Sequence, residues 1–538
     1  MITAIEIENF KGIGERQRIE FAPLTLIFGA NSSGKSTIVH ALHYLREILA
    51  SGNGDVDEIP STDGELRLGG FENLVHRHDI DRNICIRIET NMREHVAIRS
   101  HISGLKRWLG EKFDGKVMDQ IKNLGLEIEV GKADFGKLGI PLINRLLLIL
   151  NGTQFADIIV TDVIECTDER TVAHVCSIDL DHPALTKIDG VSALRIAATK
   201  CGFEFANYDP DSGENLRRIC ESIGALPTLN SLNYCSDVVE DDDKDDSQIM
   251  ESFLREFVIS LVLNSTQQMT ETLSELGHIG PIRDIPGRFL RKGISASQNS
   301  WYRGKAAWQT LLGETPRTSL KKLGSYHPYV SFHFDLQEAI GSPYRIERVG
   351  MWKADESEWT SGRHGLLVRS HLELVLRDLR TNTVVSIEDV GVGLSQVVPV
   401  LVGVRNASLP ILYVEQPERH LHPKQQAMLG DVFAHGSSIK YAKESPEGRT
   451  GANQRRTIIV ETHSELLILR LLRLVRETNL GVANDKGIKL TPRQLKVYYV
   501  GSGEEGTTFK EIQISDTGKF IQPWPDDFFE LDFQERFA

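Results

Sequence analysis

The chain has 538 residues, 40% of them hydrophobic and 25% charged, which is the composition of an ordinary globular protein long enough for several domains. A formal net charge of −14 argues against a protein coated with basic residues for unspecific nucleic-acid binding. No apolar run is long enough to span a bilayer, and the six cysteines lack metal-ligand spacing, so we expect a cytoplasmic protein with reduced thiols and no membrane partner.

The first 50 residues predict two strands, a glycine-rich loop and a helix. The apolar stretch LTLIF runs into GANSSGKS, Gly29 to Ser36, which matches the phosphate-loop pattern G-x-x-x-x-G-K-[ST]. Such a loop aims backbone N–H groups and the positive end of the following helix at a triphosphate. We expect it to bind ATP, with Lys35 on the β- and γ-phosphates and the hydroxyl of Ser36 on Mg²⁺. The other expected contacts are Gly29, Asn31, Ser32, Ser33, Gly34 and Thr37.

The contact with adenine is only weakly indicated by the sequence. Phe10 and Lys11, in the turn ENFKG, are candidates because a ring or a cation can pack on the base. For Phe10, the alternative of a residue in the hydrophobic core has equal weight.

Residues 85–275 carry mixed signals. CIRIET (85–90), LEIEV (126–130) and TVAHVCSIDL (171–180) predict strands, whereas 116–125 and 247–276 have helical spacing. The acidic tract at 236–248 predicts a solvated loop. We therefore expect an inserted, partly helical α/β region over 85–275, between two parts of one α/β domain at 1–84 and 276–538.

The last third of the chain regains a clear α/β order. RSHLELVLRD and TVVSIEDV predict paired strands, and GVGLSQVVPVLVGV predicts a helix. LPILYVEQPE and RRTIIVETHSE predict buried strands that end in polar residues, and LLILRLLRLVRE predicts an amphipathic helix. PRQLKVYYVGSG and FKEIQISDTGKF predict closing strands.

Four positions in this part carry candidate catalytic chemistry. Glu415 ends the strand ILYVE, where folds with a phosphate loop place an acid beside Mg²⁺. Gln416 follows where a water-activating carboxylate is expected, and an amide can orient water but accepts no proton at neutral pH. Glu418 is a substitute base acting through a water. His463, at the end of TIIVETHSE, is a candidate sensor of the γ-phosphate or the attacking water.

A second glycine-rich stretch, DVGVGLSQVV (389–398), places Ser395 near a predicted helix start, which would form a second anion site. One nucleotide does not need two phosphate sites on one chain, so we expect Ser395 to reach ATP held by another copy. An ordinary helix cap is the alternative.

The order of these motifs resembles the ABC-type ATPases of the RecF, SMC and OLD branch. The resemblance implies an ABC-type head, which is a P-loop fold with a mixed β-sheet flanked by helices plus an antiparallel β lobe, here with a large insertion. It also implies a head-to-tail dimer or higher oligomer, with His463 as the switch histidine and His422 near the opposing head. Gln416 stands where such ATPases usually have the catalytic glutamate, so slow hydrolysis is expected. The stretch after His463 holds no D-x-D pair, so we expect no nuclease site of the OLD type.

HIGPIRDIPGR (278–288) and GKFIQPWPDDFFE (518–530) are similar to segments of the PtuA-type ATPases of the Septu and retron anti-phage defence systems. That resemblance implies an ATPase that regulates a partner HNH nuclease, and retron versions add a reverse transcriptase and its DNA–RNA product. The alternative is a RecF/SMC-like DNA-repair or DNA-binding ATPase, with nucleic acid as its partner. A transporter head ranks last, because the LSGGQ form of the signature is absent.

Overall fold

A computed structural model gives the fold of the chain. It describes residues 1–62, 64–91, 121–132, 141–166, 169–178, 182–183, 265–286, 300–312, 330–354, 367–441, 454–482, 484, 486–504 and 506–524. The predicted acidic loop at 236–248 lies outside these residues.

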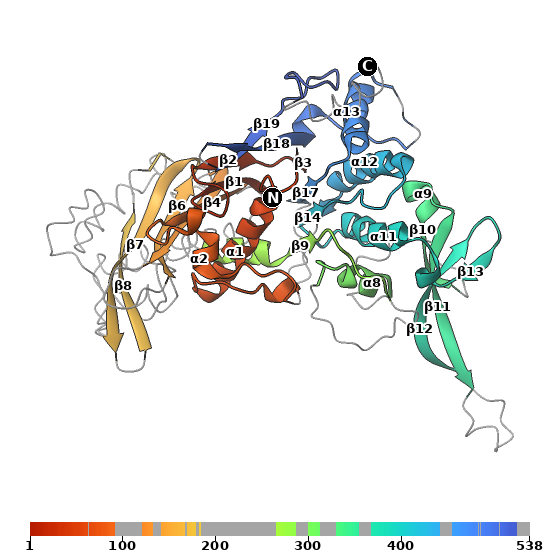
Figure 1. Ribbon diagram of the computed structural model, residues 1–538, viewed down its shortest axis with the longest axis horizontal. Coiled ribbons are helices and arrows are strands. Elements are labelled where there is room, and N and C mark those ends of the chain that lie inside the picture. The colour runs from red at the N-terminus through yellow and green to blue at the C-terminus, as the bar shows by residue number, and fades with distance from the viewer. Residues whose placement is uncertain are drawn as a thin grey trace, which may run out of the picture.

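A six-stranded sheet forms the centre of the molecule, in the order β19-β18-β3-β17-β14-β9 (Figure 1). All neighbouring strands are parallel except β18 and β19, which form an antiparallel hairpin. The strands β3, β14 and β17 are buried along their whole length, which is why they appear in the sequence as continuous apolar runs. The six strands are β3 (Leu24–Gly29), β9 (Leu276–Ile279), β14 (Ile411–Glu415), β17 (Thr457–Glu461), β18 (Leu495–Gly503) and β19 (Gly506–Glu511).

Helices cover the central sheet on both faces. Alternate side chains of each central strand enter different cores, so that Ile27 packs with α1 (Thr37–Ser51) and Leu26 packs with the helices of the other face. The helices of that second face are α8 (Lys305–Leu312), α11 (Val392–Arg405), α12 (Pro423–Ser437) and α13 (Glu465–Asn479). The predicted amphipathic helix at the end of this set is confirmed as α13.

A seven-stranded antiparallel sheet packs over α1, in the order β2-β1-β4-β5-β6-β7-β8. It runs without a break across the predicted boundary at residue 84, because β4 pairs with the N-terminal β1. The predicted helix at 116–125 is wrong at its end, since Asn123 begins β5, where apolar residues alternate with polar ones. The seven strands are β1 (Ile2–Glu8), β2 (Gln17–Glu20), β4 (Ile84–Asn91), β5 (Asn123–Lys132), β6 (Pro141–Leu150), β7 (Thr153–Cys166) and β8 (Glu169–Ile178).

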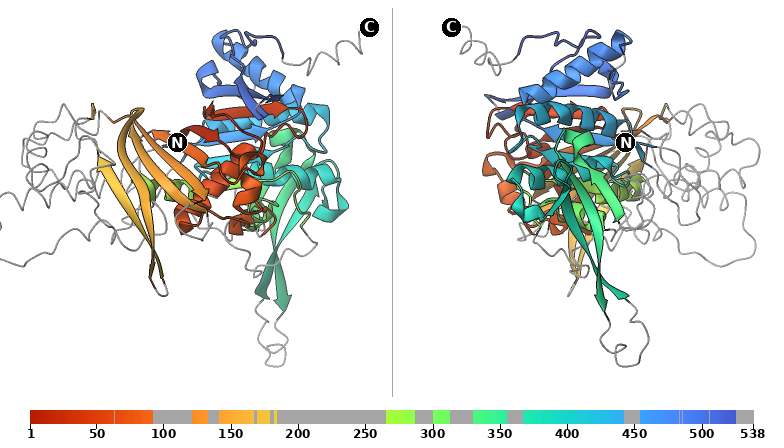
Figure 2. Two further views of the ribbon diagram at one scale, coloured as in Figure 1. Left: turned by 60° about the vertical axis from the view of Figure 1, so that its left-hand side comes forward. Right: turned by 90° about the vertical axis from the view of Figure 1, so that its right-hand side faces the viewer.

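A four-stranded antiparallel lobe lies on the other side of the central sheet, and its long β11–β12 hairpin projects from the body (Figure 2). The predicted pairing of RSHLELVLRD with TVVSIEDV is confirmed, because Leu376 faces Val385 across β12 and β13. The lobe comprises β10 (Val330–Asp335), β11 (Tyr344–Ala354), β12 (Leu367–Asp378), β13 (Thr383–Val385) and the short helix α9 (Leu336–Ile340).

The remaining elements are short. A helical segment at 265–274 is followed by one turn residue and then β9, so the predicted helix at 247–276 is too long at its end by two residues. The other elements are α2 (Gly70–Leu74), β15 (Lys440–Tyr441) and β16 (Gln454–Arg455).

Within the described ranges, no helix combines the length and the apolar character needed to cross a membrane. The predicted mixed α/β fold with flanking helices and an antiparallel lobe is confirmed.

Candidate nucleotide-binding site

The predicted phosphate loop joins β3 to α1, as the strand–loop–helix context requires. Ser32 and Gly34 have positive φ angles of 61° and 95°, which fold the loop into a concave turn. Gly34 has no room for a side chain, because a Cβ there would lie 2.5 Å from the Oγ1 of Thr507. The loop therefore depends on glycine for both backbone conformation and space.

Thr507, on β19, supports the loop from the C-terminal part of the chain. Its backbone N–H donates to the carbonyl of Gly12 over 2.7 Å, and its hydroxyl donates to the carbonyl of Ser33 over 3.1 Å. Sequence reasoning gave this threonine no role. Its only local signal is a place in the glycine-rich turn GSGEEGT, which does not reveal a partner more than 470 positions away.

Lys35 lies at the base of the loop, where its side chain is 7% exposed. Its Nζ donates to the carbonyl oxygens of Ala30 and Gly29, over 2.6 and 3.2 Å. Burial lowers the pKa of Lys35, and the nearby Glu461, Glu418 and Glu415 act in the opposite direction. Three acids therefore gather around the predicted phosphate-binding lysine. Among the other predicted contacts, Asn31 and Ser32 are exposed, and Ser33 and Thr37 are buried.

The strand order brings the predicted magnesium ligands together. β17 lies between β3 and β14, so the ends of all three parallel strands meet beside the start of α1. The Oγ of Ser36 lies 3.4 Å from the Oε2 of Glu415, at hydrogen-bond distance, although 379 positions separate the two residues. Their role as Mg²⁺ ligands stays a prediction, but a hydroxyl and a carboxylate are oxygen ligands that suit this ion.

A second acid, Glu461, was missed by the sequence reasoning. It ends β17 and is the register partner of Glu415 on β14, and its Oε2 accepts a 3.0 Å hydrogen bond from the Oγ of Ser36. The hydroxyl of Tyr413 donates to its other carboxylate oxygen. Burial raises the pKa of Glu461, and the charge of Glu415 raises it further. The available signal was that TIIVE ends in an acid as ILYVE does.

Two buried histidines stand behind Glu415. The Nε2 of His278 lies 2.7 Å from the Oε1 of Glu415, and its Nδ1 lies 2.9 Å from the Nε2 of His43. A carboxylate only accepts, so His278 carries its proton on Nε2 and accepts from His43. His278 belongs to the segment HIGPIR, which sequence reasoning used only for its resemblance.

Arg283, in the same segment, connects the end of β14 to helix α11. Its guanidinium donates to the backbone carbonyl of Glu415 and, over 3.1 Å, to that of Gln396. The side chain of Gln396 in turn accepts from the N–H of Arg283 over 3.0 Å and donates to its carbonyl over 2.6 Å. Burial lowers the pKa of Arg283 to about 10. The strand end that carries the acids is thus tied to the helix of the glycine-rich signature.

Gln416 follows Glu415 in an unusual backbone conformation, with a φ of 43°. This left-handed region costs a residue with a side chain roughly 1–2 kcal/mol. Its side chain is partly exposed and has no hydrogen-bond partner among the residues that the structure describes. The amide is therefore free to contact a ligand or a water.

Glu418 and His463 contact each other through the backbone. The carboxylate of Glu418 accepts from the N–H of His463 over 2.7 Å and from the hydroxyl of Thr462 over 3.0 Å. Burial raises the pKa of Glu418. Burial, with a smaller contribution from Lys35, lowers the pKa of His463, and its buried Nε2 has no partner in the described part of the chain. The imidazole is thus neutral and able to bind a ligand, while both oxygens of Glu418 are engaged.

Ser395 lies in the first turn of α11, but Gly391 is the residue that caps this helix. The cap alternative is therefore wrong for Ser395. The serine is buried and its hydroxyl donates to the carbonyl of Val392 over 2.8 Å. Contact with ATP on another copy stays a prediction, and it requires either the exposed backbone around Gly391 or a different rotamer of Ser395. His422, in the HLHP turn, is exposed and caps α12.

The prediction that Phe10 contacts adenine is wrong. Its ring is fully buried and packs against Tyr44, with 5.7 Å between the ring centroids, because α1 covers this turn. Lys11 is partly exposed, and its Nζ lies 2.7 Å from the Nδ1 of His40 on α1. Burial lowers the pKa of Lys11 to about 8. Its contact with a nucleotide stays a prediction.

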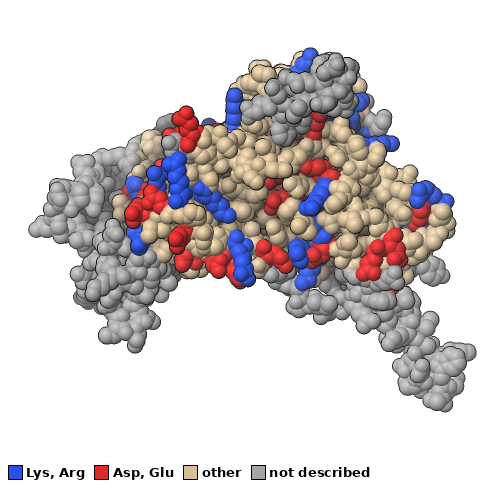
Figure 3. Space-filling view, viewed as in Figure 1, with Lys and Arg blue, Asp and Glu red and all other residues tan. Residues whose placement is uncertain are grey.

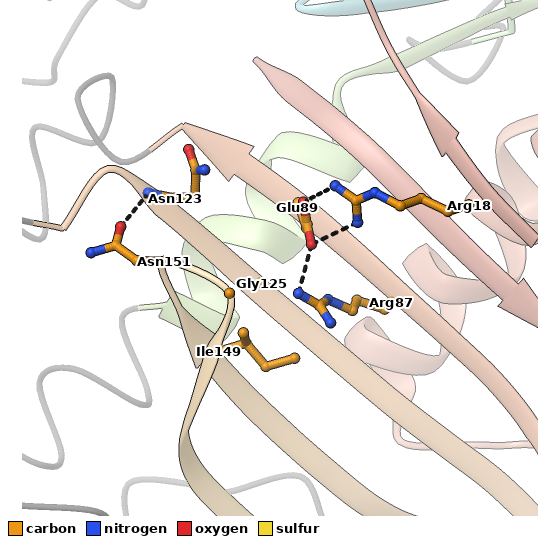
Figure 4. A pocket seen from close by; sticks show the side chains of 8 residues that line it. Arg18, Arg87, Glu89, Asn123, Gly125, Ile149 and Asn151 are labelled. Atoms are coloured by element: carbon orange, nitrogen blue, oxygen red, sulfur yellow. Dashed lines mark hydrogen bonds and ion pairs between the residues drawn. The ribbon is translucent and has the colours of Figure 1, made fainter. Parts of the chain in front are cut away.

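A cavity of about 280 Å³ lies elsewhere, on the antiparallel sheet (Figure 4). Glu89 sits between Arg18 and Arg87 there and forms an ion pair with each, at 2.8 and 2.7 Å. Asn123 and Asn151 close the other side of the cavity. Both arginines that line this cavity are thus paired with an acid.

Comparison with known proteins agrees with this geometry. A family model described as "AAA ATPase domain" matches residues 1–130, and one described as "AAA domain, putative AbiEii toxin, Type IV TA system" matches residues 327–470. The first match contains the phosphate loop, and the second contains Glu415, Gln416 and His463. The mixed α/β fold, with its phosphate loop between a parallel strand and a helix, is consistent with an ABC-type P-loop ATPase head. The two matches support an ATPase of the AAA type.

Solved structures with a distant likeness include SMC heads. The SMC head domain from Thermotoga maritima has 9% identity and a TM-score of 0.34, over 95% of this chain and 99% of that one. The Smc head domain from Pyrococcus furiosus, with an extended coiled coil and bound to the C-terminal domain of ScpA, has 11% identity and a TM-score of 0.36, over 95% and 96%. Among curated proteins, none matches the sequence.

Proposed function

We propose that this ATPase head binds ATP, hydrolyses it slowly, and acts as a nucleotide switch that regulates a partner HNH nuclease in an anti-phage defence complex. The observation that carries the proposal is the edge of the central sheet, where Lys35, Ser36, Glu415 and His463 gather around one phosphate loop. The Nε2 of His463 has no hydrogen-bond partner among the described residues. These groups suit a nucleotide with its Mg²⁺.

The amide of Gln416 favours a switch over a motor. Gln416 follows Glu415, the acid that ends β14, at the place where a general base would act. A general base typically raises the rate about a hundred- to ten-thousand-fold, and an amide does not supply this help. Glu418 is a poor substitute, because its two oxygens hold the backbone of His463 and the hydroxyl of Thr462. Slow turnover prolongs the ATP-bound state, in which two heads meet head to tail.

The proposal places the nuclease on a separate subunit. The family model that matches residues 327–470 is described by a putative toxin of a type IV TA system. The resemblance to PtuA-type ATPases supplies the HNH class of the partner and, in a retron, a reverse transcriptase with its DNA–RNA product.

The DNA-handling alternative would need a basic surface for the nucleic-acid backbone. On the face shown in Figure 3, the described Lys and Arg side chains are interspersed with Asp and Glu. On the antiparallel sheet, Arg16, Arg18 and Arg145 are each paired with more than one acid. The described charges of these two regions therefore favour the switch.

The test is purification of the tagged chain from its own host, followed by identification of the copurifying proteins and a nuclease assay with and without ATP. We expect a nuclease to copurify and its activity to depend on nucleotide. The Lys35→Ala variant, which removes the phosphate-binding cation, should lose that dependence. Nucleic-acid cleavage by the chain alone, or ATP-dependent retention of DNA without any nuclease, would overturn the proposal.

A further inference from the structure

The two glutamates at the ends of β14 and β17 are held in the same way. His278 occupies the Oε1 of Glu415 at 2.7 Å, and the hydroxyl of Tyr413 occupies the Oε1 of Glu461. The Oε2 atoms of both glutamates are left facing one group, the Oγ of Ser36, at 3.4 and 3.0 Å. Each acid thus has one oxygen fixed by a neighbour and one directed at the predicted magnesium ligand of the phosphate loop.

A bound cation would balance the negative charge of Glu415 and Glu461. Glu415 and Glu461 are 9% and 3% exposed, and among the described residues neither forms an ion pair with a Lys or Arg; the contact of Glu415 with His278 is a hydrogen bond. The ammonium group of Lys35 donates to the carbonyls of Gly29 and Ala30 and not to either acid. A buried ionised carboxylate is strongly unfavourable unless a cation or a proton neutralises it, and Mg²⁺ prefers such hard oxygen ligands.

The loop itself supplies an independent sign of a ligand. Ser33 is 7% exposed, and its buried Oγ has no hydrogen-bond partner within the described ranges. This oxygen lies beside Gly29, since a Cβ on that glycine would approach it to 3.2 Å. A buried hydroxyl rarely stays unpaired, so a bound group that reaches the floor of the loop is expected to engage it.

We infer that Glu461 is a second carboxylate of the magnesium site and acts there together with Ser36 and Glu415. Tyr413 and His278 are the residues that orient the two acids, as outer-shell partners do at other metal sites. The inference rests on the proposed function, because the ion is the Mg²⁺ of bound ATP. It adds a strand-end ligand that sits between the phosphate-loop strand and the strand of Glu415.

The test measures metal affinity directly, with Mn²⁺ as the probe. Mn²⁺ is titrated by electron paramagnetic resonance into the full-length protein saturated with a non-hydrolysable ATP analogue. We expect Glu461→Gln, which keeps the size and can still hydrogen-bond Tyr413, to weaken Mn²⁺ binding by about tenfold or more, in line with the loss of a metal-site group. Tyr413→Phe should weaken it less, because the carboxylate remains.

Two controls separate metal binding from folding. Glu347→Gln removes an equally buried acid in the antiparallel lobe, where Glu347 pairs with Arg377 at 2.9 Å, and should leave Mn²⁺ affinity within about twofold. Binding of the analogue in the presence of EDTA shows that Glu461→Gln still forms the phosphate loop.

Three outcomes would contradict either the inference about Glu461 or the proposed function itself. Unchanged Mn²⁺ affinity in Glu461→Gln would overturn the inference, and so would a fall in ATP turnover at unchanged Mn²⁺ affinity, because Glu461 would then act on water. If wild-type protein binds neither the analogue nor Mn²⁺, the proposed function itself fails.

Discussion

The backbone N–H of Gln416 donates to the carbonyl oxygen of Glu461, 2.9 Å away on the neighbouring strand. On the other side of the same turn, Arg283 donates to the carbonyl of Glu415. The two bonds hold Gln416 in its left-handed conformation, so its side chain leaves the end of β14 in a direction that the backbone fixes.

This geometry predicts the effect of Gln416→Glu. A glutamate has the same shape and meets no new backbone strain, but it can accept a proton from water. We expect the ATP turnover number to rise at least several-fold, measured as phosphate release at saturating Mg²⁺–ATP. The Lys35→Ala variant should bind no ATP and gives the background rate. An unchanged turnover number would show that the chemistry is not limited at this position.

Gly34→Ala tests the support of the phosphate loop by Thr507. The new methyl group would lie 2.5 Å from the threonine hydroxyl, at a φ of 95° that disfavours any side chain. We expect the affinity for ATP, measured by calorimetry, to fall by about tenfold or more. Gly64→Ala is the matched control, because Gly64 also has a positive φ of 76° but has nothing within 4 Å of an added methyl. Equal effects of the two changes would contradict the role of Thr507.

Arg283→Met tests the connection between β14 and α11. The change keeps the length of the side chain but removes the hydrogen bonds to Glu415 and to the carbonyl of Gln396, in a site that is 2% exposed. Buried hydrogen bonds from a charged group are worth about 1.5–3 kcal/mol each, so we expect the melting temperature to fall by several degrees. Arg303→Met should have little effect, because Arg303 is 41% exposed and its ion pairs with the described Glu65 and Asp284 lie at the surface. Equal melting temperatures in the two variants would show that Arg283 stabilises nothing.

The histidines of α1 predict a dependence of stability on pH. Burial lowers the pKa of His40 to about 3 and lowers the pKa of His43 well below its ordinary value of 6.5. Below pH 6.5 the unfolded chain therefore binds protons that the folded chain does not, and stability falls as the pH falls toward 3. Melting temperatures between pH 7 and pH 4 should drop less in His40→Gln than in wild type. The exposed His420→Gln should follow wild type, and a wild-type slope in His40→Gln would contradict the prediction.

Local motifs explain which parts of the site the sequence could predict. GANSSGKS, ILYVEQPE and TIIVETHSE each combine a buried strand with a polar end, so their strand–loop context is visible within a dozen residues. The partners of these motifs are set by the order of the strands in the sheet. Glu461 meets Ser36 from 425 positions away, and His278 meets Glu415 from 137. Periodicity carries no information about such pairings.

Phe10 illustrates a different limit. An aromatic residue in a polar turn suits a base or a core equally well, and only the path of α1 over the turn decides that the ring is buried. The inserted region was also misjudged because the decisive contacts are made by distant parts of the chain. Its alternating strands extend the sheet begun by β1, so a boundary drawn from composition divides one sheet in two.

The position of β3 in the central sheet has a consequence for biosynthesis. This strand is made within the first 29 residues, but its two neighbours, β17 and β18, are completed only at residues 461 and 503. On the ribosome, at roughly 5–20 residues per second, the phosphate loop must wait about 20 seconds or more for the strands that enclose it. During that interval a strongly apolar strand has no lateral partner from the central sheet. Newly made chains are therefore expected to depend on chaperones and to gain nucleotide affinity only when translation is nearly finished.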